Sequence, residues 1–174
     1  TGGEVLQLDT ASLGLVRTIV LQHSDTADGE TQGRGIPNYL GAAVISPDGS
    51  QAYVPSKQDN VKRGALRDPG TALNFQNTVR AISSRIDLGT ENEDYPARVD
   101  HDNSGVANAA VYDRYGIYLF VALETSREVA VVDAFGHSEI FRFQVGRAPQ
   151  GLAISPDGLK LYVNNFMDGT IGVF

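Results

Sequence analysis

The segment 100–108 has the residue types of a calcium-binding loop. Its sequence reads D-x-D-x-S-G-x-x-N, and the oxygen ligands would be Asp100, Asp102, Ser104 and Asn108. Ca²⁺ takes about six to eight hard oxygen ligands, and a glycine permits the sharp turn that such a loop makes. The pattern is degenerate, because Ser104 replaces an acid and Val111 stands where an EF-hand has Glu. A polar turn closed by Asx hydrogen bonds is therefore the alternative interpretation.

Histidine and the charged side chains are the other candidates for chemistry. The three histidines are His23, His101 and His137, and no H-x-H or H-E-x-x-H spacing joins them. His23 stands in an acidic stretch that could gather near His101, although solvated loop polarity explains the same residues. The segment 57–68 holds four cations and, together with a turn at Arg147, could bind an anionic group or an acidic partner. A charged, solvated insertion is the alternative.

We therefore single out a set of candidate binding residues, chosen because their expected positions are loops or strand ends. They are His23, Lys57, Arg63, Arg67, Glu124, Arg147 and Asn165. Glu124 and Asn165 would also be the acid and the amide that converge on a channel metal if the chain were a lactonase-like hydrolase. No catalytic residue is assigned.

Composition excludes several classes of function. The 174 residues contain no cysteine, which excludes disulfides, thiolate metal sites, Cys nucleophiles and covalently attached c-type haem within this chain. A net charge of −7 without a basic stripe argues against nucleic-acid binding. There is no G-x-S-x-G elbow, no phosphate-binding loop and no apolar run long enough to span a membrane.

The elements that must position these residues come from a repeat. An apolar strand, a turn and a second apolar strand recur at 43–54, 110–121 and 152–163, and two of the turns read Ser-Pro-Asp-Gly. The interval from Val121 to Val163 is 42 residues, the length of one propeller blade, whereas the interval from Val54 to Val121 is 67 residues. Repeats of about 40 residues with several short strands each are typical of a β-propeller.

The sequence thus predicts an all-β fold: a partial β-propeller of four-stranded antiparallel blades, with two full blades and a partial blade at each end. Its strands, labelled a to d from the channel outward, would be 1–9 (c), 15–21 (d), 39–46 (a), 51–56 (b), 78–87 (c), 95–100 (d), 107–112 (a), 117–123 (b), 128–133 (c), 139–145 (d), 150–155 (a), 159–165 (b) and 170–174 (c). We expect residues 1–174 to be one domain and a fragment of a longer chain, with open blade edges that could associate.

Both large insertions fall on the same face of this propeller. The insertions at 22–38 and 57–77 connect strands d to a and b to c, and in an up-and-down blade these connections share one face. Loops of this length are more often functional or disordered than merely connecting, and drift by insertion is a further alternative. We therefore expect any working site on that face.

Two stretches of the chain resemble a known family. The turn Ser-Pro-Asp-Gly followed by Leu161-Tyr162-Val163-Asn164-Asn165 resembles the YVTN-type β-propeller repeat of extracytoplasmic proteins, and residues 51–55 and 119–123 depart from it. Residues 54–60 and 145–151 are similar to YVTN propellers that precede c-type cytochrome modules of the di-haem peroxidase kind. The resemblance implies a periplasmic or cell-surface location, and it implies haem only through sequence outside this chain or through a partner.

Two functions remain from the sequence, besides the lactonase-like hypothesis. The first is a non-catalytic propeller module that docks a protein partner or an adjoining domain through its long-loop face, with calcium as the candidate ion and no other cofactor. The second is the propeller portion of a periplasmic redox protein, whose partner would be a c-type cytochrome module. The second predicts that His23 or His101 points into the channel beside Lys57, Arg63 or Arg147. We favour the first, because a fold alone does not imply a reaction.

Overall fold

Turns built on an aspartate close the repeated hairpins. Asp48 Oδ1 accepts hydrogen bonds from the Ser46 hydroxyl at 2.6 Å and from the Ser50 backbone N–H at 3.0 Å. Asp157 receives the equivalent two bonds at 2.5 and 3.0 Å. The glycine after each aspartate has a positive φ of 72° or 76°, a conformation that suits glycine. The Ser46 hydroxyl bond and the backbone bond hold the pKa of Asp48 below its usual value.

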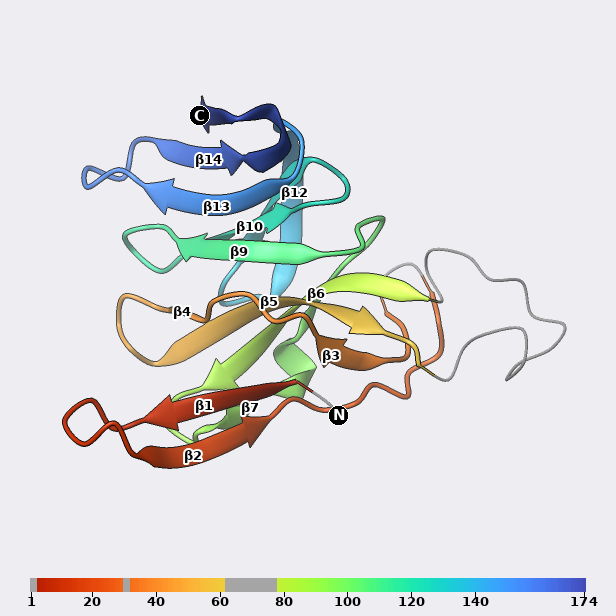
Figure 1. Cartoon of the computed structure of the whole chain (residues 1–174), viewed down its shortest axis with the longest axis vertical. Helices are drawn as coiled ribbons and strands as arrows, with labels where there is room; N and C mark the ends of the chain where they lie inside the picture. The colour runs from red at the N-terminus through yellow and green to blue at the C-terminus, as the bar shows by residue number, and fades with distance from the viewer. Residues whose placement is uncertain (1–2, 30–31, 62–77) are drawn as a thin grey trace, which may run out of the picture.

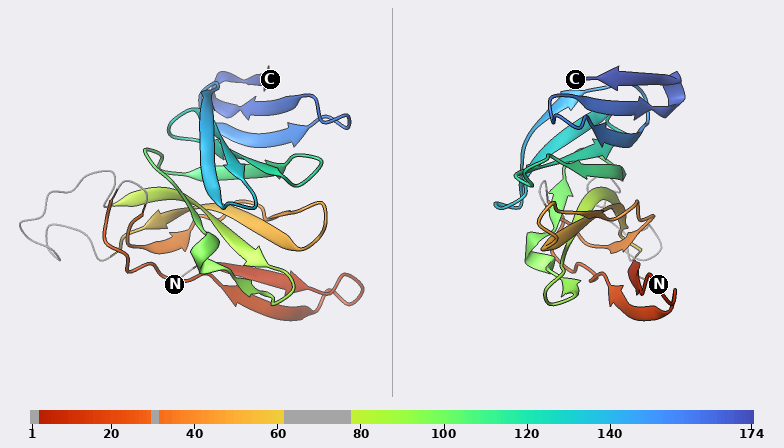
Figure 2. Two further views of the ribbon diagram at one scale, coloured as in Figure 1. Left: turned by 180° about the vertical axis from the view of Figure 1, so that it is seen from behind. Right: turned by 90° about the vertical axis from the view of Figure 1, so that its left-hand side faces the viewer.

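A computed structural model describes residues 3–29, 32–61 and 78–174, and it confirms the all-β partial propeller. Four antiparallel sheets lie one above another, and Figures 1 and 2 show this stack from three sides. No α-helix occurs within the ranges that the structure describes.

The central sheet is a complete four-stranded blade in the order β12-β11-β10-β9. Its strands are β9 (Ala107–Tyr112), β10 (Tyr118–Leu123), β11 (Glu128–Asp133) and β12 (Ser138–Gln144). The C-terminal sheet above it has β13 (Pro149–Ile154), β14 (Leu161–Asn165) and β15 (Thr170–Val173), with a 3₁₀ turn η3 (Phe166–Asp168) before β15. At the other end, β1 (Glu4–Leu8) and β2 (Leu15–Val20) pair as the N-terminal hairpin. The predicted strands of these three sheets are confirmed to within a few residues.

The fourth sheet, which we call the long-strand sheet, lies between the N-terminal hairpin and the central sheet. Its elements are β3 (Ile36–Asn38), β4 (Val44–Ile45), β5 (Gln51–Asp59), β6 (Val79–Asp87), β7 (Asn92–Glu93), the 3₁₀ turn η2 (Tyr95–Ala97) and β8 (Val99–His101). The strands β5 and β6 pair over nine residues each, so the ladder continues past the point where residues 51–56 were predicted to end. Lys57 therefore lies in a strand.

The innermost strand of this sheet was predicted as one piece at 39–46, and this is wrong. It is split into β3 and β4, which pair with different parts of β5. Between them the chain turns at Tyr39, which has a φ of 50°, and passes close to the central sheet. A Cβ placed on Gly41 would lie 2.3 Å from the Asn108 carbonyl oxygen, so this approach requires glycine.

The outer strand predicted at 95–100 is also wrong in its bounds. Residues 95–97 form η2, and two short strands, β7 and β8, pair with β6 on either side of it. Pro96 explains the interruption, because proline has no N–H to donate to a ladder. The consequence is that His101 ends a strand and does not lie in a loop.

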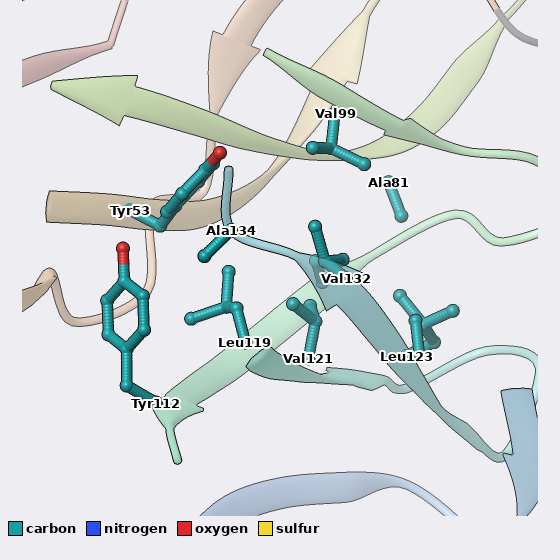
Figure 3. Packing of buried hydrophobic residues seen from close by; sticks show 11 residues of the cluster. Tyr53, Ala81, Val99, Tyr112, Leu119, Val121, Leu123, Val132 and Ala134 are labelled. Atoms are coloured by element: carbon teal, nitrogen blue, oxygen red, sulfur yellow. The ribbon is translucent and has the colours of Figure 1, made fainter. Parts of the chain in front are cut away.

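The largest core fills the space between the long-strand sheet and the central sheet. Figure 3 shows Tyr53 of β5 and Tyr112 of β9 beside Leu119, Val121 and Leu123 of β10. The two tyrosine rings are tilted, with centroids 6.3 Å apart. Smaller apolar clusters join the N-terminal hairpin to the long-strand sheet and the C-terminal sheet to the central sheet. Each sheet therefore rests on its neighbour through apolar side chains.

Candidate functional site

The long connections leave one side of the stack. The tight turns β1–β2, β4–β5, β9–β10 and β13–β14 lie to the left in Figure 1, and the β2–β3 connection and the far ends of β5 and β6 lie to the right. We call the right-hand side the long-connection face. The connection from Leu21 to Gly35 is tied to itself by two backbone hydrogen bonds between Ser24 and Gly35, of 2.8 and 2.9 Å.

A buried ion pair holds this connection to the sheet beneath. The Arg80 guanidinium donates to Asp100 Oδ2 at 2.6 Å, and the two side chains are 3% and 11% exposed. A second nitrogen of Arg80 donates to the Gly29 carbonyl at 2.8 Å. Burial raises the pKa of Asp100, and the hydrogen bond and charge of Arg80 oppose that rise.

A second arginine, Arg98, joins the same connection to β7 and β5. Arg98 donates to the Gln22 carbonyl at 2.7 Å, to Glu93 Oε1 at 2.5 Å and to Gln58 Oε1 at 3.0 Å. Gln58 in turn donates to the Gly33 carbonyl at 2.8 Å. Arg98 and Glu93 are 7% and 1% exposed, so these bonds form away from water. Backbone carbonyls of a loop that accept from buried arginines and a buried glutamine have a fixed position.

A hollow of about 180 Å³ lies beneath this connection. It is lined by Ser24, Thr26, Gln32, Gly33, Gln58, Ile82, Tyr95, Pro96, Arg98 and Asp100. The Arg98 guanidinium lies 4.5 Å from the centre of the Tyr95 ring, within range of a cation–π contact.

A second hollow, of about 380 Å³, lies where the central and C-terminal sheets meet. It is lined by Glu124, Thr125, Arg127, Arg147, Ala148 and Met167. Glu124 accepts hydrogen bonds from the Asn108 amide and, at 3.3 Å, from the Gln150 amide, so one carboxylate joins β9 to β13. Arg147 pairs with Asp168 at 2.5 Å and remains 53% exposed. The structure thus brings together Glu124 and Arg147, which the sequence singled out separately.

Asn165 holds the turn beside this hollow in place. Its side chain accepts from the Gly146 N–H at 3.0 Å and donates to the Thr170 hydroxyl at 3.3 Å, and the residue is buried. It holds the turn that carries Arg147, which is a positioning role.

The remaining candidate binding residues are dispersed. His23 forms an ion pair of 3.4 Å with Asp25, and Lys57 forms one of 2.9 Å with Asp59. Arg63 and Arg67 lie outside the described residues, so their part in the predicted anion site stays a prediction.

The four predicted calcium ligands each have a different environment. Asp100 faces Arg80, the Ser104 hydroxyl lies 3.2 Å from the Thr125 hydroxyl, and Asn108 donates to Glu124. Asp102 accepts from Asn103 at 2.8 Å. Over the described ranges, no group of three or more His, Cys, Asp or Glu side chains could hold a metal ion. Calcium binding by this loop stays a prediction.

His101 lies in an arrangement that the sequence did not indicate. It is fully buried between the long-strand and central sheets, with Nε2 2.9 Å from the Ser83 hydroxyl and Nδ1 2.9 Å from Glu139 Oε2. Glu139 also forms an ion pair with Arg142. A serine, a histidine and a carboxylate in this order resemble a nucleophile, a base and an orienting acid. Ser83 is also fully buried, so a substrate cannot reach it, and the arrangement joins two sheets.

Sequence reasoning missed Arg80, Arg98 and Glu139. Their partners lie on other strands and loops, and Glu139 lies 38 residues from His101. No local spacing could have indicated these contacts, although the sequence places Arg80, Arg98 and His101 near the ends of predicted strands. No helix in the described part of the chain is long and apolar enough to cross a membrane.

The comparisons with known proteins agree with the fold. No protein-family model and no curated protein sequence matches this chain. Among solved structures, hydrazine synthase of Kuenenia stuttgartiensis is similar over 98% of this chain and 51% of its own, with a TM-score of 0.77 and 16% identity. A candidate 6-phosphogluconolactonase of Bacteroides fragilis is similar over 98% of this chain and 59% of its own, with a TM-score of 0.50 and 16% identity.

These likenesses define the class of fold. The chain is a β-propeller domain, and it spans 51% and 59% of the two structures just named. A likeness at 16% sequence identity shows a shared architecture and does not show a shared activity.

Proposed function

We propose that this chain is a non-catalytic β-propeller module of an extracytoplasmic protein, and that it docks a protein partner or an adjoining domain through its long-connection face. The observation that carries the proposal is the buried Arg80–Asp100 and Arg98–Glu93 network. It holds the described residues of the connection, 21–29 and 32–35, against the sheet beneath as a shaped surface.

A pre-formed surface favours binding because little conformational entropy is lost when a partner arrives. Two hollows open on this surface, and exposed arginine and methionine side chains at Arg127, Arg147 and Met167 lie around the second. Arginine and methionine are enriched at protein interfaces. The resemblance to YVTN repeats supports the extracytoplasmic location.

The absence of cysteine from the chain provides a direct test. One cysteine is introduced on the long-connection face as Arg127→Cys, and a matched one on the turn face as Leu159→Cys, where the native side chain is 79% exposed. Each variant is labelled with a thiol reagent twice: as the 174-residue chain alone, and within the complete protein isolated from its own source.

We expect the thiol at position 127 to react in the chain alone and to be protected in the complete protein, whereas the thiol at position 159 reacts in both. Equal reactivity of position 127 in both preparations would overturn the proposed docking face. Protection of position 159 alone would place the contact on the turn face and would overturn it as well.

A second candidate is the propeller portion of a redox protein. Its support is the similarity of residues 54–60 and 145–151 to propellers that precede cytochrome modules, together with the likeness of the fold to hydrazine synthase. Visible absorbance of the complete protein tests it. A Soret band would support the redox function, and a colourless protein of full mass would eliminate haem and leave the docking module.

A further inference from the structure

One turn of the central sheet has an arginine where the same turn of the C-terminal sheet has a glycine. Arg127 ends the connection from β10 to β11, and Gly169 ends the connection from β14 to β15, 42 residues later in the repeat. Their φ angles are 60° and 61°. A side chain disfavours this left-handed conformation, whereas glycine adopts it freely. Strain that is avoided at Gly169 is thus retained at Arg127, and retained strain points to a use for the side chain.

Contacts within the chain do not explain this arginine. Over the described residues, the exposed Arg127 side chain forms no hydrogen bond and no ion pair. The nearby Asp168 accepts instead from the Arg147 backbone N–H at 2.6 Å and from its guanidinium at 2.5 Å. These two hydrogen bonds, more than the charge of Arg127, hold the pKa of Asp168 below its usual value. The other nearby acid, Glu124, accepts hydrogen bonds from two amides. Arg127 is therefore a cation without an acid of its own.

Arg127 lines the hollow of about 380 Å³ between the central and C-terminal sheets, and both walls of this hollow are held in place. On one wall, the Arg127 carbonyl accepts from the Val145 N–H at 2.9 Å, and the Thr125 hydroxyl accepts from a backbone N–H at 2.7 Å. On the other, the Arg147 carbonyl accepts from the Met167 N–H at 3.2 Å. Both walls are thus formed by residues that the structure describes.

We propose that Arg127 binds a carboxylate of the docked partner or adjoining domain, an aspartate or glutamate side chain that enters this hollow and accepts two hydrogen bonds from the guanidinium. The proposal rests on the docking function proposed above and names the chemistry of one of its contacts. The planar guanidinium matches the two oxygens of a carboxylate. Glu124 also lines the hollow, so a single carboxylate fits better than a phosphate dianion, because a like charge disfavours the second negative charge.

The first test asks whether Arg127 is there for stability. Arg127→Gly in the 174-residue chain should leave the midpoint of urea unfolding at or above that of the wild type, because glycine suits the φ of 60°. Gly169→Ala should lower the midpoint through φ alone, since an added Cβ would meet no atom within 4 Å. A lower midpoint for Arg127→Gly would show that the arginine stabilises its own turn, and would overturn the proposal.

The second test follows a thiol on the opposite wall of the hollow. Met167→Cys replaces a side chain that is 63% exposed, and its rate of labelling is measured in the complete protein isolated from its own source and in the 174-residue chain alone. In the complete protein, adding Arg127→Gln should raise the rate about fivefold, the upper range for an exposed ion pair. The rate should stay below that of the chain alone, because the other contacts of the face remain.

Two further variants separate the chemistry from a general loosening. Arg127→Lys keeps the charge and loses the fork, so it should raise the labelling rate less than Arg127→Gln does. Arg114→Gln changes an arginine of the turn face, which stacks on Tyr115, and should leave the rate unchanged. High salt should raise the rate with the native Arg127 and have little effect in Arg127→Gln, because salt screens an exposed ion pair. Phosphatase treatment should change nothing, and a rise in the rate would assign a phosphate and overturn the carboxylate.

The outcomes distinguish this contact from the docking function itself. A thiol at position 167 that is protected in the complete protein, and equally so with arginine, lysine or glutamine at position 127, would overturn the carboxylate contact and leave the docking function standing. A thiol that reacts in the complete protein as fast as in the chain alone, with the native Arg127 present, would count against docking at this hollow and would overturn both.

Discussion

The strands β11 and β15 are the same element of the repeat in two different environments. Val129 and Val131 of β11 are at most 3% exposed, whereas Ile171 and Val173 of β15 are at least 55% exposed. The residue types are alike, and the difference is that a sheet lies on both sides of β11 and on one side of β15. In this fold, burial is decided by the number of neighbouring sheets as much as by the residue.

The largest expected contrast lies between two ion pairs. Arg80→Ala should lower the free energy of unfolding by about 3–5 kcal/mol, because it leaves the Asp100 carboxylate buried without its cation. Arg147→Ala, in the C-terminal sheet, removes a pair whose arginine is 53% exposed and should cost about 0–1 kcal/mol. Urea unfolding of both variants measures the two changes. Similar costs would show that the inner network does not hold the connection.

Substituting the repeat positions themselves tests the comparison directly. Val129→Ala should cost about 2 kcal/mol, because it removes buried methyl groups and leaves a cavity. Ile171→Ala removes more carbon atoms but should change stability by less than about 0.5 kcal/mol, because the side chain is already in water. Both are measured by urea unfolding at a concentration where the chain is monomeric. A larger effect for Ile171→Ala would mean that its face is covered.

A smaller contrast concerns one hydroxyl. The Tyr53 hydroxyl lies 3.0 Å from His137 Nδ1, between the long-strand and central sheets, and burial raises the pKa of this phenol above its usual value. Tyr53→Phe should cost about 1 kcal/mol, the net value of one hydrogen bond. Tyr115→Phe, at a tyrosine that is 69% exposed, should leave the thermal midpoint unchanged. A neutral Tyr53→Phe would indicate that the histidine gains nothing from this contact.

The smallest expected effect is a pH dependence of the free energy of unfolding that arises from His137, between the same two sheets. Partial burial, followed by the charge of Arg85, lowers the pKa of His137 below 6.5. The unfolded chain therefore binds this proton more readily, so the contribution to stability is present above about pH 6.5 and is lost as the pH falls through the folded pKa. His137→Asn should flatten the profile in this window, and asparagine tolerates the positive φ of 52° at this position.

Unfolding free energies measured across that window check this prediction. The exposed aspartates of the turns, such as Asp48 and Asp157, have lowered pKa values and lose their contribution only at more acid pH. An unchanged slope in His137→Asn would assign the dependence to other groups.

Much of the central and C-terminal sheets followed from local pattern. Alternating apolar residues predicted the strands, and the bonds of Asp157 lie within the turn of the C-terminal sheet that it closes. The long-strand sheet did not follow in the same way. At Gly41 the chain approaches the Asn108 carbonyl of the central sheet, and this contact divides the strand that was predicted at 39–46. Pro96 divides the outer strand for a local reason, because proline has no N–H to donate to the ladder.

For the candidate site, the sequence predicted which types of residue lie on one face, and it did not predict how these residues are arranged. Glu124 and Arg147 were identified separately, and the structure places them at one hollow. Asn165 proved to be a support for the turn, and His101 joined Ser83 and Glu139 in the interior. The partners of these side chains come from other sheets, which no spacing along the chain could show.

By itself, the sequence determined the repeat, the turns and the all-β architecture, because strand alternation and Asp–Gly turn bonds depend on residues that are close along the chain. Only the tertiary structure decided which of these apolar faces are buried, which arginines hold the Leu21–Gly35 connection, and that His101 joins two sheets. Burial and buried hydrogen bonds depend on which elements stack together, and that arrangement is set by contacts between distant segments.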